Sequence, residues 1–198
     1  MNAVSGFAAN MGRHAILAAV IALAPLPTAA LDLTPHLGFR ELEDVKIPVV
    51  ELADGAAKVS FQPPAGWQVS GGRSLLTFTP PIPNEVIVEL RIDTVSPADP
   101  KEPLGLDKWC RKFLPMLATQ IALAGEAASP FTLKGLPSHE HTYTYAYQAR
   151  RFVTSVAVVD LSPKQRLSLV VTAYPENFKA TYELAVQTLS SFDWKGDR

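Results

Sequence analysis

The 198-residue chain contains a single cysteine, Cys110, and carries almost no net charge. One cysteine cannot form an internal disulfide, so the fold must rest on its apolar core. A formal net charge of −1 gives no general attraction to nucleic acid or to an anionic membrane surface, and neither is expected as a partner. Cys110 lies in a helical pattern beside Trp109 and Phe113, which predicts a buried structural thiol.

The chain also lacks recognisable catalytic motifs. It has no G-x-S-x-G nucleophile elbow, no P-loop, no H-E-x-x-H helix and no Rossmann glycine pattern. Gly71 and Gly72 precede Arg73, but no helical pattern follows them, so they predict a hairpin turn and not a phosphate-binding loop. We therefore expect a protein that is not an enzyme and has no cofactor.

The longest apolar run lies at the N-terminus. Arg13 and His14 precede an alanine- and leucine-rich run, which is followed by two prolines and the small residues Thr28, Ala29 and Ala30. This layout predicts a signal peptide over residues 1–30, with Met11 as an alternative start, and a secreted or periplasmic protein. The alternative is an uncleaved anchor, although the run is short for a bilayer span. Membrane contact is expected only through such an uncleaved segment.

With 47% hydrophobic and 19% charged residues, the remainder has the composition of one globular domain. Residues 31–45 are aperiodic and are predicted to form a loose arm, and residues 46–198 a single domain. Two hairpins are predicted, one turning at Asp54-Gly55 and the other at Gly71-Gly72. Residues 85–93 alternate between apolar and charged side chains, which is typical of a half-exposed antiparallel strand.

The second half of the chain predicts helices on either side of further strands. An apolar helical stripe runs from Leu106 to Ala124 with Pro115 inside it, which predicts a kink or two helices. Residues 138–148 and 151–161 predict strands, and residues 167–173 predict a buried inner strand. Pro175 then begins a helix whose apolar face includes Phe178 and Leu189. These patterns favour an antiparallel α+β sheet.

Phe61, Pro64, Gly66 and Trp67 form an F-x-x-P-x-G-W start, a central helix carries Trp109, and the last helix closes on Ser191-Phe192. This arrangement is similar to the PsbP-like superfamily of PsbP and DcrB-like exported proteins, over about residues 56–194. The resemblance implies an α/β/α sandwich, with a central antiparallel sheet of about six to seven strands flanked by helices. It also implies an accessory or binding role without catalytic machinery. Its fold-marking residues here are Phe61, Pro64, Gly66, Trp67, Ser191 and Phe192.

Five residues on one face of the strand over residues 138–148 are candidates for a site. His139 and His141 could supply two metal ligands, but no third ligand is visible nearby, and a histidine pair on a sheet face is the alternative. Tyr143, Tyr145 and Tyr147 form an aromatic ladder that either packs under a helix or lines a ligand-binding groove.

Two functional hypotheses follow from these patterns. The first is an exported, non-catalytic binding or accessory protein of the cell envelope, whose partner is an envelope protein or a small ligand. The alternative is a metal-binding or enzymatic protein that uses His139 and His141.

Overall fold

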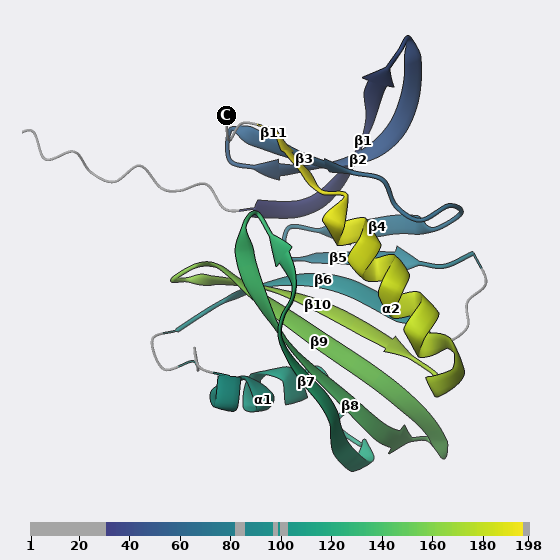
Figure 1. Ribbon diagram of the computed structural model, residues 1–198, viewed down its shortest axis with the longest axis vertical. Helices are drawn as coiled ribbons and strands as arrows, with labels where there is room; N and C mark the ends of the chain where they lie inside the picture. Colours follow the sequence, from purple (N-terminus) through teal and green to yellow (C-terminus); the bar gives the residue numbers. More distant parts are fainter. Residues whose placement is uncertain (1–30, 82–85, 97–98, 100–102, 196–198) are drawn as a thin grey trace, which may run out of the picture.

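The computed structural model describes residues 31–81, 86–96, 99 and 103–195 (Figure 1). The predicted signal peptide lies outside these residues. The elements of the described part follow in chain order: β1 (Leu31–Leu42), β2 (Val45–Asp54), β3 (Ala57–Phe61), β4 (Gln68–Gly72), β5 (Leu75–Thr79), β6 (Ile87–Thr94), α1 (Pro103–Arg111), β7 (Thr119–Leu133), β8 (Leu136–Tyr147), β9 (Arg150–Ser162), β10 (Gln165–Ala173), α2 (Pro175–Ser190) and β11 (Asp193–Lys195).

The body of the molecule is a seven-stranded antiparallel sheet in the order β4-β5-β6-β10-β9-β8-β7. β10 pairs with β6 on one side and β9 on the other, and its residues from Arg166 to Ala173 are all buried. This confirms the predicted inner strand, whose apolar residues on both faces require cover on both sides. A second sheet, in the order β1-β2-β3-β11, lies beside the first.

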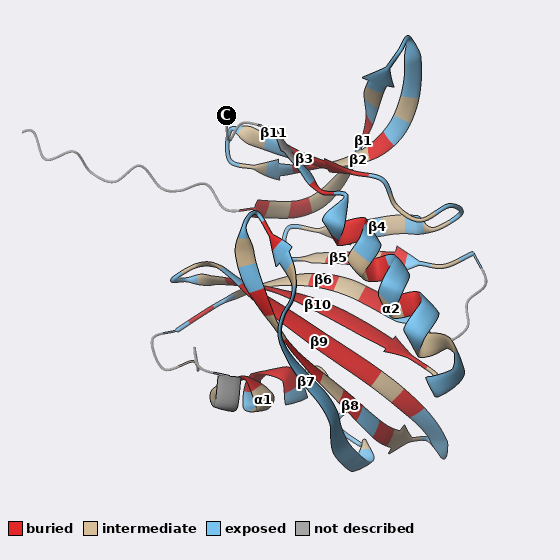
Figure 2. Cartoon of the chain, viewed as in Figure 1, coloured by how far each residue is buried: buried red, intermediate tan, exposed pale blue. Residues whose placement is uncertain are grey.

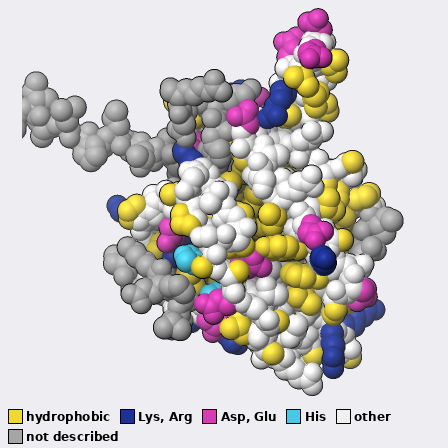
Figure 3. Space-filling view, viewed as in Figure 1, with side chains coloured by type: hydrophobic (Ala, Val, Ile, Leu, Met, Phe, Trp, Pro, Cys, Tyr) yellow, Lys and Arg dark blue, Asp and Glu magenta, His cyan; other side chains and the backbone are white. Residues whose placement is uncertain are grey.

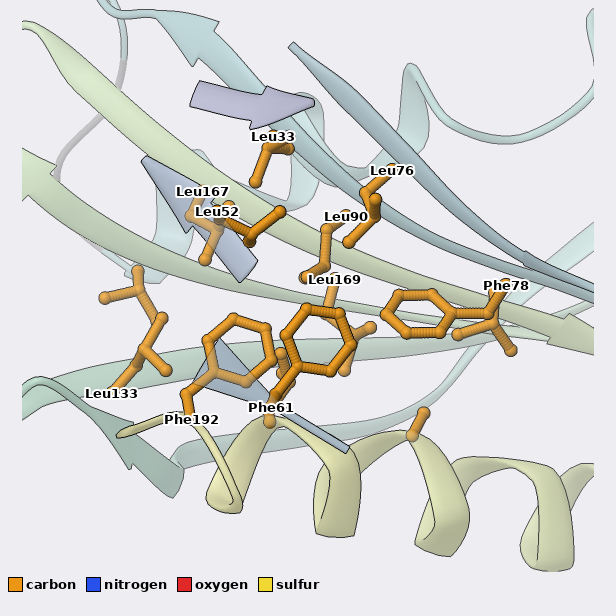
Figure 4. Close-up of a cluster of buried hydrophobic side chains, with 14 of the residues drawn as sticks. Leu33, Leu52, Phe61, Leu76, Phe78, Leu90, Leu133, Leu167, Leu169 and Phe192 are labelled. Atoms are coloured by element: carbon orange, nitrogen blue, oxygen red, sulfur yellow. The ribbon is translucent and has the colours of Figure 1, made fainter. Parts of the chain in front are cut away.

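One face of the large sheet is covered by α2 together with the small sheet. Figure 4 shows Phe61 and Phe192 above α2, with Leu52 of the small sheet and Leu90 and Leu169 of the large sheet around them. Pro175 occupies the start of α2, where its missing N–H costs no hydrogen bond. The predicted helix after the inner strand is confirmed.

The opposite face of the large sheet is covered by α1. Leu106, Trp109 and Cys110 lie at helical spacing and pack on Tyr143 of β8 and Val156 of β9. The middle of β9 and nearly all of β10 are buried (Figure 2), as cover on both faces requires. Helices on the two faces of an antiparallel sheet confirm the predicted α+β sandwich.

The predicted loose arm over residues 31–45 is wrong. Leu31–Leu42 is strand β1, which pairs antiparallel with β2 and buries Leu31 and Leu33 in the core. A register shift between Asp32 and His36 interrupts the two-residue alternation, so the sequence shows no strand period there. The outer parts of β1 and β2 leave the body as a two-stranded projection (Figure 1).

The predicted helical stripe to Ala124 is also wrong beyond Arg111. α1 ends at Arg111, and Thr119–Leu133 is the edge strand β7, which absorbs the short strand predicted over residues 131–134. Pro115 stands between the two elements, since proline removes a helical hydrogen bond and disfavours helical geometry before it. β7 pairs with β8 through three register shifts, which interrupt the alternation that would have marked it as a strand.

Both predicted hairpins exist, but their turns lie further along the chain. β2 and β3 are joined at Gly55-Ala56, one residue later than predicted. Gly71 and Gly72 belong to β4, and the turn before β5 is formed by Arg73 and Ser74.

Candidate functional site

The tyrosines of β8 are mostly packed. Tyr143 is fully buried under α1, and its hydroxyl donates to Asp107 Oδ1 at 2.9 Å. The Tyr145 hydroxyl lies 3.1 Å from Thr154 Oγ1, and only Tyr147, at the strand end, is half-buried. Burial raises the pKa of Tyr143 and of Tyr145 above the ordinary tyrosine value. The ladder was expected either to pack under a helix or to line a groove, and Tyr143 packs under a helix.

A cleft of about 430 Å³ opens beside Tyr145. Its walls come from the start of β7, the facing ends of β8 and β9 and the start of α2: Gln120, Thr144, Tyr145, Arg151, Phe152, Val153 and Pro175. Aromatic side chains and one guanidinium group in such a space suit a small anionic ligand with an apolar part. The sequence did not predict this cleft, because Gln120 and Pro175 are distant from Tyr145 along the chain.

His139 and His141 lie on the same face but have different neighbours. His141 is 2% exposed, with Nδ1 at 3.9 Å from Cys110 Sγ and Nε2 at 4.0 Å from Glu126 Oε1. His139 borders a separate pocket of about 120 Å³ with Asp160. In residues 31–81, 86–96, 99 and 103–195, no group of three His, Cys, Asp or Glu side chains could hold a metal ion. A metal role for the two histidines therefore stays a prediction.

Cys110 and His141 have the residue types of a nucleophile and its base, but their surroundings do not suit that chemistry. Cys110 is fully buried, and burial raises the pKa of its thiol to about 12. A neutral thiol is a poor nucleophile, and no described cleft reaches it. The predicted buried structural thiol is confirmed.

Glu140 is a buried carboxyl group that the sequence did not single out. Ser155 Oγ donates to Glu140 Oε1 at 2.6 Å, Thr142 Oγ1 donates to the same oxygen at 3.1 Å, and the Tyr182 hydroxyl donates to Oε2. Burial and the carboxylate raise the pKa of Tyr182. These bonds connect β8, β9 and α2, so Glu140 holds the helix on the sheet. Alternation along β8 places Glu140 on the face opposite His141, but it does not predict that the Tyr182 hydroxyl of α2 contacts it.

The fold-marking residues lie where the small sheet, the large sheet and α2 meet. The Phe61 and Phe192 rings stack with their centroids 4.6 Å apart. Pro64 and Trp67 pack against the buried face of α2, and the Trp67 N–H donates to the Pro64 carbonyl at 3.0 Å. Gly66 has a φ of +78°, which glycine adopts without strain in this turn. Ser191 ends α2 as its C-cap.

The projecting part of β1 and β2, residues 37–50, is called the ribbon below. Leu37 is 77% exposed, and Phe39, Leu42 and Val45 are each about 60% exposed. The ribbon projects from the body of the molecule (Figure 1), and Figure 3 shows apolar side chains on it beneath an acidic tip. Large exposed apolar side chains gathered on one projection are typical of interaction surfaces. The sequence did not predict this surface, because residues 31–45, which form most of its exposed part, showed no strand period.

Comparison with known proteins gives no match to a family model and no match among curated proteins. Among solved structures, the chain resembles LpqN of Mycobacterium tuberculosis, with 11% identity, a TM-score of 0.50 and coverage of 81% of this chain and 91% of LpqN. It also resembles the Mog1 E65A mutant, with 13% identity, a TM-score of 0.50 and coverage of 80% and 95%.

A PsbP from the cyanobacterium Synechocystis sp. PCC 6803 matches with 15% identity, a TM-score of 0.46 and coverage of 68% of this chain and 85% of that one. At these identities the likeness concerns the fold alone. LpqN and Mog1 share the PsbP-like fold. The resemblance found from Phe61, Trp67 and Phe192 is therefore confirmed: this chain has the PsbP-like fold.

Proposed function

We propose that this chain is an exported, non-catalytic binding protein of the cell envelope that acts by contacting a protein partner. The ribbon is the observation that carries the proposal. It holds four large apolar side chains in water, at a place where they add nothing to the core. Such side chains lower the free energy of an assembly when a partner covers them.

Two further observations support the envelope setting. Residues 1–30 have the pattern of a signal peptide, although they lie outside the described residues. LpqN, which has a similar fold, is described as involved in cell envelope biogenesis. Within the described residues, neither helix has the length and apolarity needed to cross a membrane.

Site-specific photo-crosslinking in the envelope tests this function. A photoreactive residue replaces Phe39 on the ribbon in one variant and Lys179, a highly exposed residue of α2, in a matched control. We expect one defined protein adduct from position 39 and none from position 179. Mass spectrometry of the exported chain should give an N-terminus near Leu31. A cytoplasmic chain, or the absence of adducts from any surface position, would contradict the proposal.

A second candidate function is the binding of a small ligand in the cleft beside Tyr145, favoured by its volume of about 430 Å³ and by the guanidinium of Arg151. A thermal-shift screen with aromatic carboxylates tests it, since a ligand that binds only the folded state raises the melting temperature. The shift should disappear in Arg151→Gln and persist in Arg73→Gln, which alters a distant exposed arginine. An unchanged melting temperature across the screen would remove this candidate.

A further inference from the structure

The ribbon is apolar on both of its faces. Cross-strand pairing places Leu37 opposite Val50 and Phe39 opposite Pro48 on one face. Near the tip, Leu42 lies opposite Val45 on the other face. Val50 is partly buried against the core, whereas Phe39 with Pro48 and Leu42 with Val45 are exposed pairs, one on each face. A strand with one face on a core normally turns polar side chains to water, so this hairpin differs from a solvated one.

The ribbon also has two open edges among the described strands. β3 pairs with β2 only from Val50 to Asp54, so residues 45–49 have β1 as their sole described neighbour. β1 is the outer strand of the small sheet. Near the start of β1 its outer edge contacts the large sheet, where the Leu33 N–H donates to the Arg73 carbonyl. An isolated two-stranded hairpin is marginally stable in water, and a bound partner stabilises it by covering its faces or pairing with its edges.

Charge at the tip of the ribbon indicates the chemistry of that partner. Glu41, Glu43 and Asp44 surround the turn. Two cations lie near them: Lys46 is opposite Glu41 across the ribbon, and Arg40 pairs with Asp193. Figure 3 shows this acidic cluster at the extreme end of the molecule. An acidic cluster beside an apolar strip is complementary to a partner surface that carries positive charge.

The ribbon of a second copy, with the residues around its base, is a poor source of such a surface. The cations around the base of the ribbon already face acidic side chains in four ion pairs: Arg40 with Asp193, Lys58 with Glu51, Arg73 with Asp32 and Lys134 with Asp54. Two ribbons packed tip to tip would bring their acidic clusters together. The charges therefore disfavour a dimer in which two ribbons meet.

We propose that the ribbon is a wedge that inserts into an apolar groove rimmed by lysine and arginine on another protein. This inference rests on the proposed function, namely that the chain binds a protein, and adds the binding element and the chemistry of its target. The apolar pairs at Leu37 and Phe39 supply the buried contacts. Glu41 and Glu43 pair with the basic rim and set the orientation.

Selection of random peptides displayed on phage tests the proposal on the purified protein. The peptides enriched on wild type should combine aliphatic or aromatic residues with lysine or arginine, and their binding should weaken as salt rises. In the variant Leu37→Ser with Phe39→Ser, affinity should fall by at least about tenfold, the loss typical of truncated central contacts. The matched control is Met116→Ser, a 98% exposed residue distant in sequence from the ribbon, whose affinity should stay unchanged.

A second pair of variants distinguishes the contribution of charge to peptide binding from that of apolar contacts. Glu41→Gln with Glu43→Gln should weaken binding and remove most of its salt dependence, whereas Glu176→Gln with Glu183→Gln on α2 should change neither. All these side chains are exposed, so each variant should keep the wild-type fold. Circular dichroism of each variant checks this.

Three results would overturn the inference. Acidic enriched peptides would refute the basic groove, and peptides unaffected by the Leu37 and Phe39 changes would place binding elsewhere while leaving the proposed function standing. Sedimentation showing a dimer that dissociates on Phe39→Ser would make the ribbon a self-interface. If neither peptides nor photo-crosslinks are obtained at any surface, the proposed function itself fails.

Discussion

The rings of Phe61 and Phe192 stack at an interplanar angle of 24°, and they join three separate parts of the fold. Phe61 ends β3 in the small sheet, whereas Phe192 follows the last turn of α2. Phe78 of the large sheet lies 5.8 Å from the Phe61 ring. This contact is therefore the place where the two sheets and the helix depend on one another.

We expect Phe192→Ala to lower the free energy of unfolding by about 3–5 kcal/mol, through lost burial and the cavity left behind. Phe39→Ala is the matched control, because the same change at an exposed ring should stay within about 0.5 kcal/mol of wild type. Urea unfolding followed by fluorescence measures both. Equal effects of the two substitutions would refute the role assigned to the stacked pair.

The elements that the sequence predicted well are those with an uninterrupted period. β10 is a continuous run of apolar residues, because a strand buried on both faces needs apolar side chains on both. α2 shows an apolar helical stripe after Pro175, because only one of its faces is buried. β1 and β7 were missed, because register shifts move their side chains out of phase. The ribbon was missed for a different reason: its pairing is regular from Leu37 to Leu42, but its exposed apolar residues serve no core of this chain and so give no alternation of buried and polar side chains.

The candidate site was predicted less well than the fold. Alternation along β8 correctly placed His141 and Tyr143 on one face, but which element covers that face depends on contacts far apart in sequence. α1 covers Tyr143, whereas the cleft beside Tyr145 is completed by Pro175 at the start of α2. Local periodicity contains no information about such distant neighbours.

The buried Glu140 carboxyl should be energetically coupled to α2. We expect Tyr182→Phe to cost about 1.5–3 kcal/mol of unfolding free energy, since it removes a hydrogen bond to a charged group. In a Glu140→Leu background the same change should cost much less, because the acceptor is already gone. A double-mutant cycle by urea unfolding measures this coupling. Strictly additive effects, or an equal cost for Tyr147→Phe at the strand end, would show that the bond does not hold the helix.

Gly71 and Gly72 should differ sharply in their tolerance of a side chain. A Cβ added at Gly71 would lie 2.2 Å from the Leu75 carbonyl oxygen, a backbone atom that cannot move aside, whereas at Gly72 it would meet nothing within 4 Å. We expect Gly71→Ala to destabilise the fold by about 1–3 kcal/mol, the range for overpacking, and Gly72→Ala to be nearly neutral. Thermal melts of the two variants provide the measurement. A reversed order would place the β4–β5 pairing in a different register.

Asp107 should make stability depend on pH at the acidic end. The hydrogen bond from Arg111 is the main cause that lowers the pKa of Asp107 from its ordinary value, and Tyr143 adds a second bond. An acid with a lowered folded-state pKa stabilises the fold above its unfolded pKa of about 3.9, and this is lost as pH falls through the folded value. Asp107→Asn should therefore cost about 0.5–1 kcal/mol at neutral pH, a range reduced for solvent screening.

At pH near 2, wild type and Asp107→Asn should differ much less, because the wild-type carboxyl is then largely protonated. Urea unfolding of both proteins across the acidic range gives the two curves. A difference that is independent of pH would mean that the substituted amide disturbs packing and that the charge of the carboxylate itself contributes nothing.

The thiol of Cys110 should be unreactive in the folded protein. With its pKa raised to about 12 by burial, almost none of the thiol is thiolate at neutral pH, and its side chain lies buried between α1 and the large sheet. A thiol-reactive dye should therefore label native protein only as fast as the protein opens, and should label it at once in denaturant. Phe192→Ala, which destabilises the fold at a distance from Cys110, should accelerate native labelling, while the exposed Phe39→Ala should not. Rapid labelling of native wild type would contradict this and would make a reactive pair of Cys110 and His141 the better interpretation of their 3.9 Å contact.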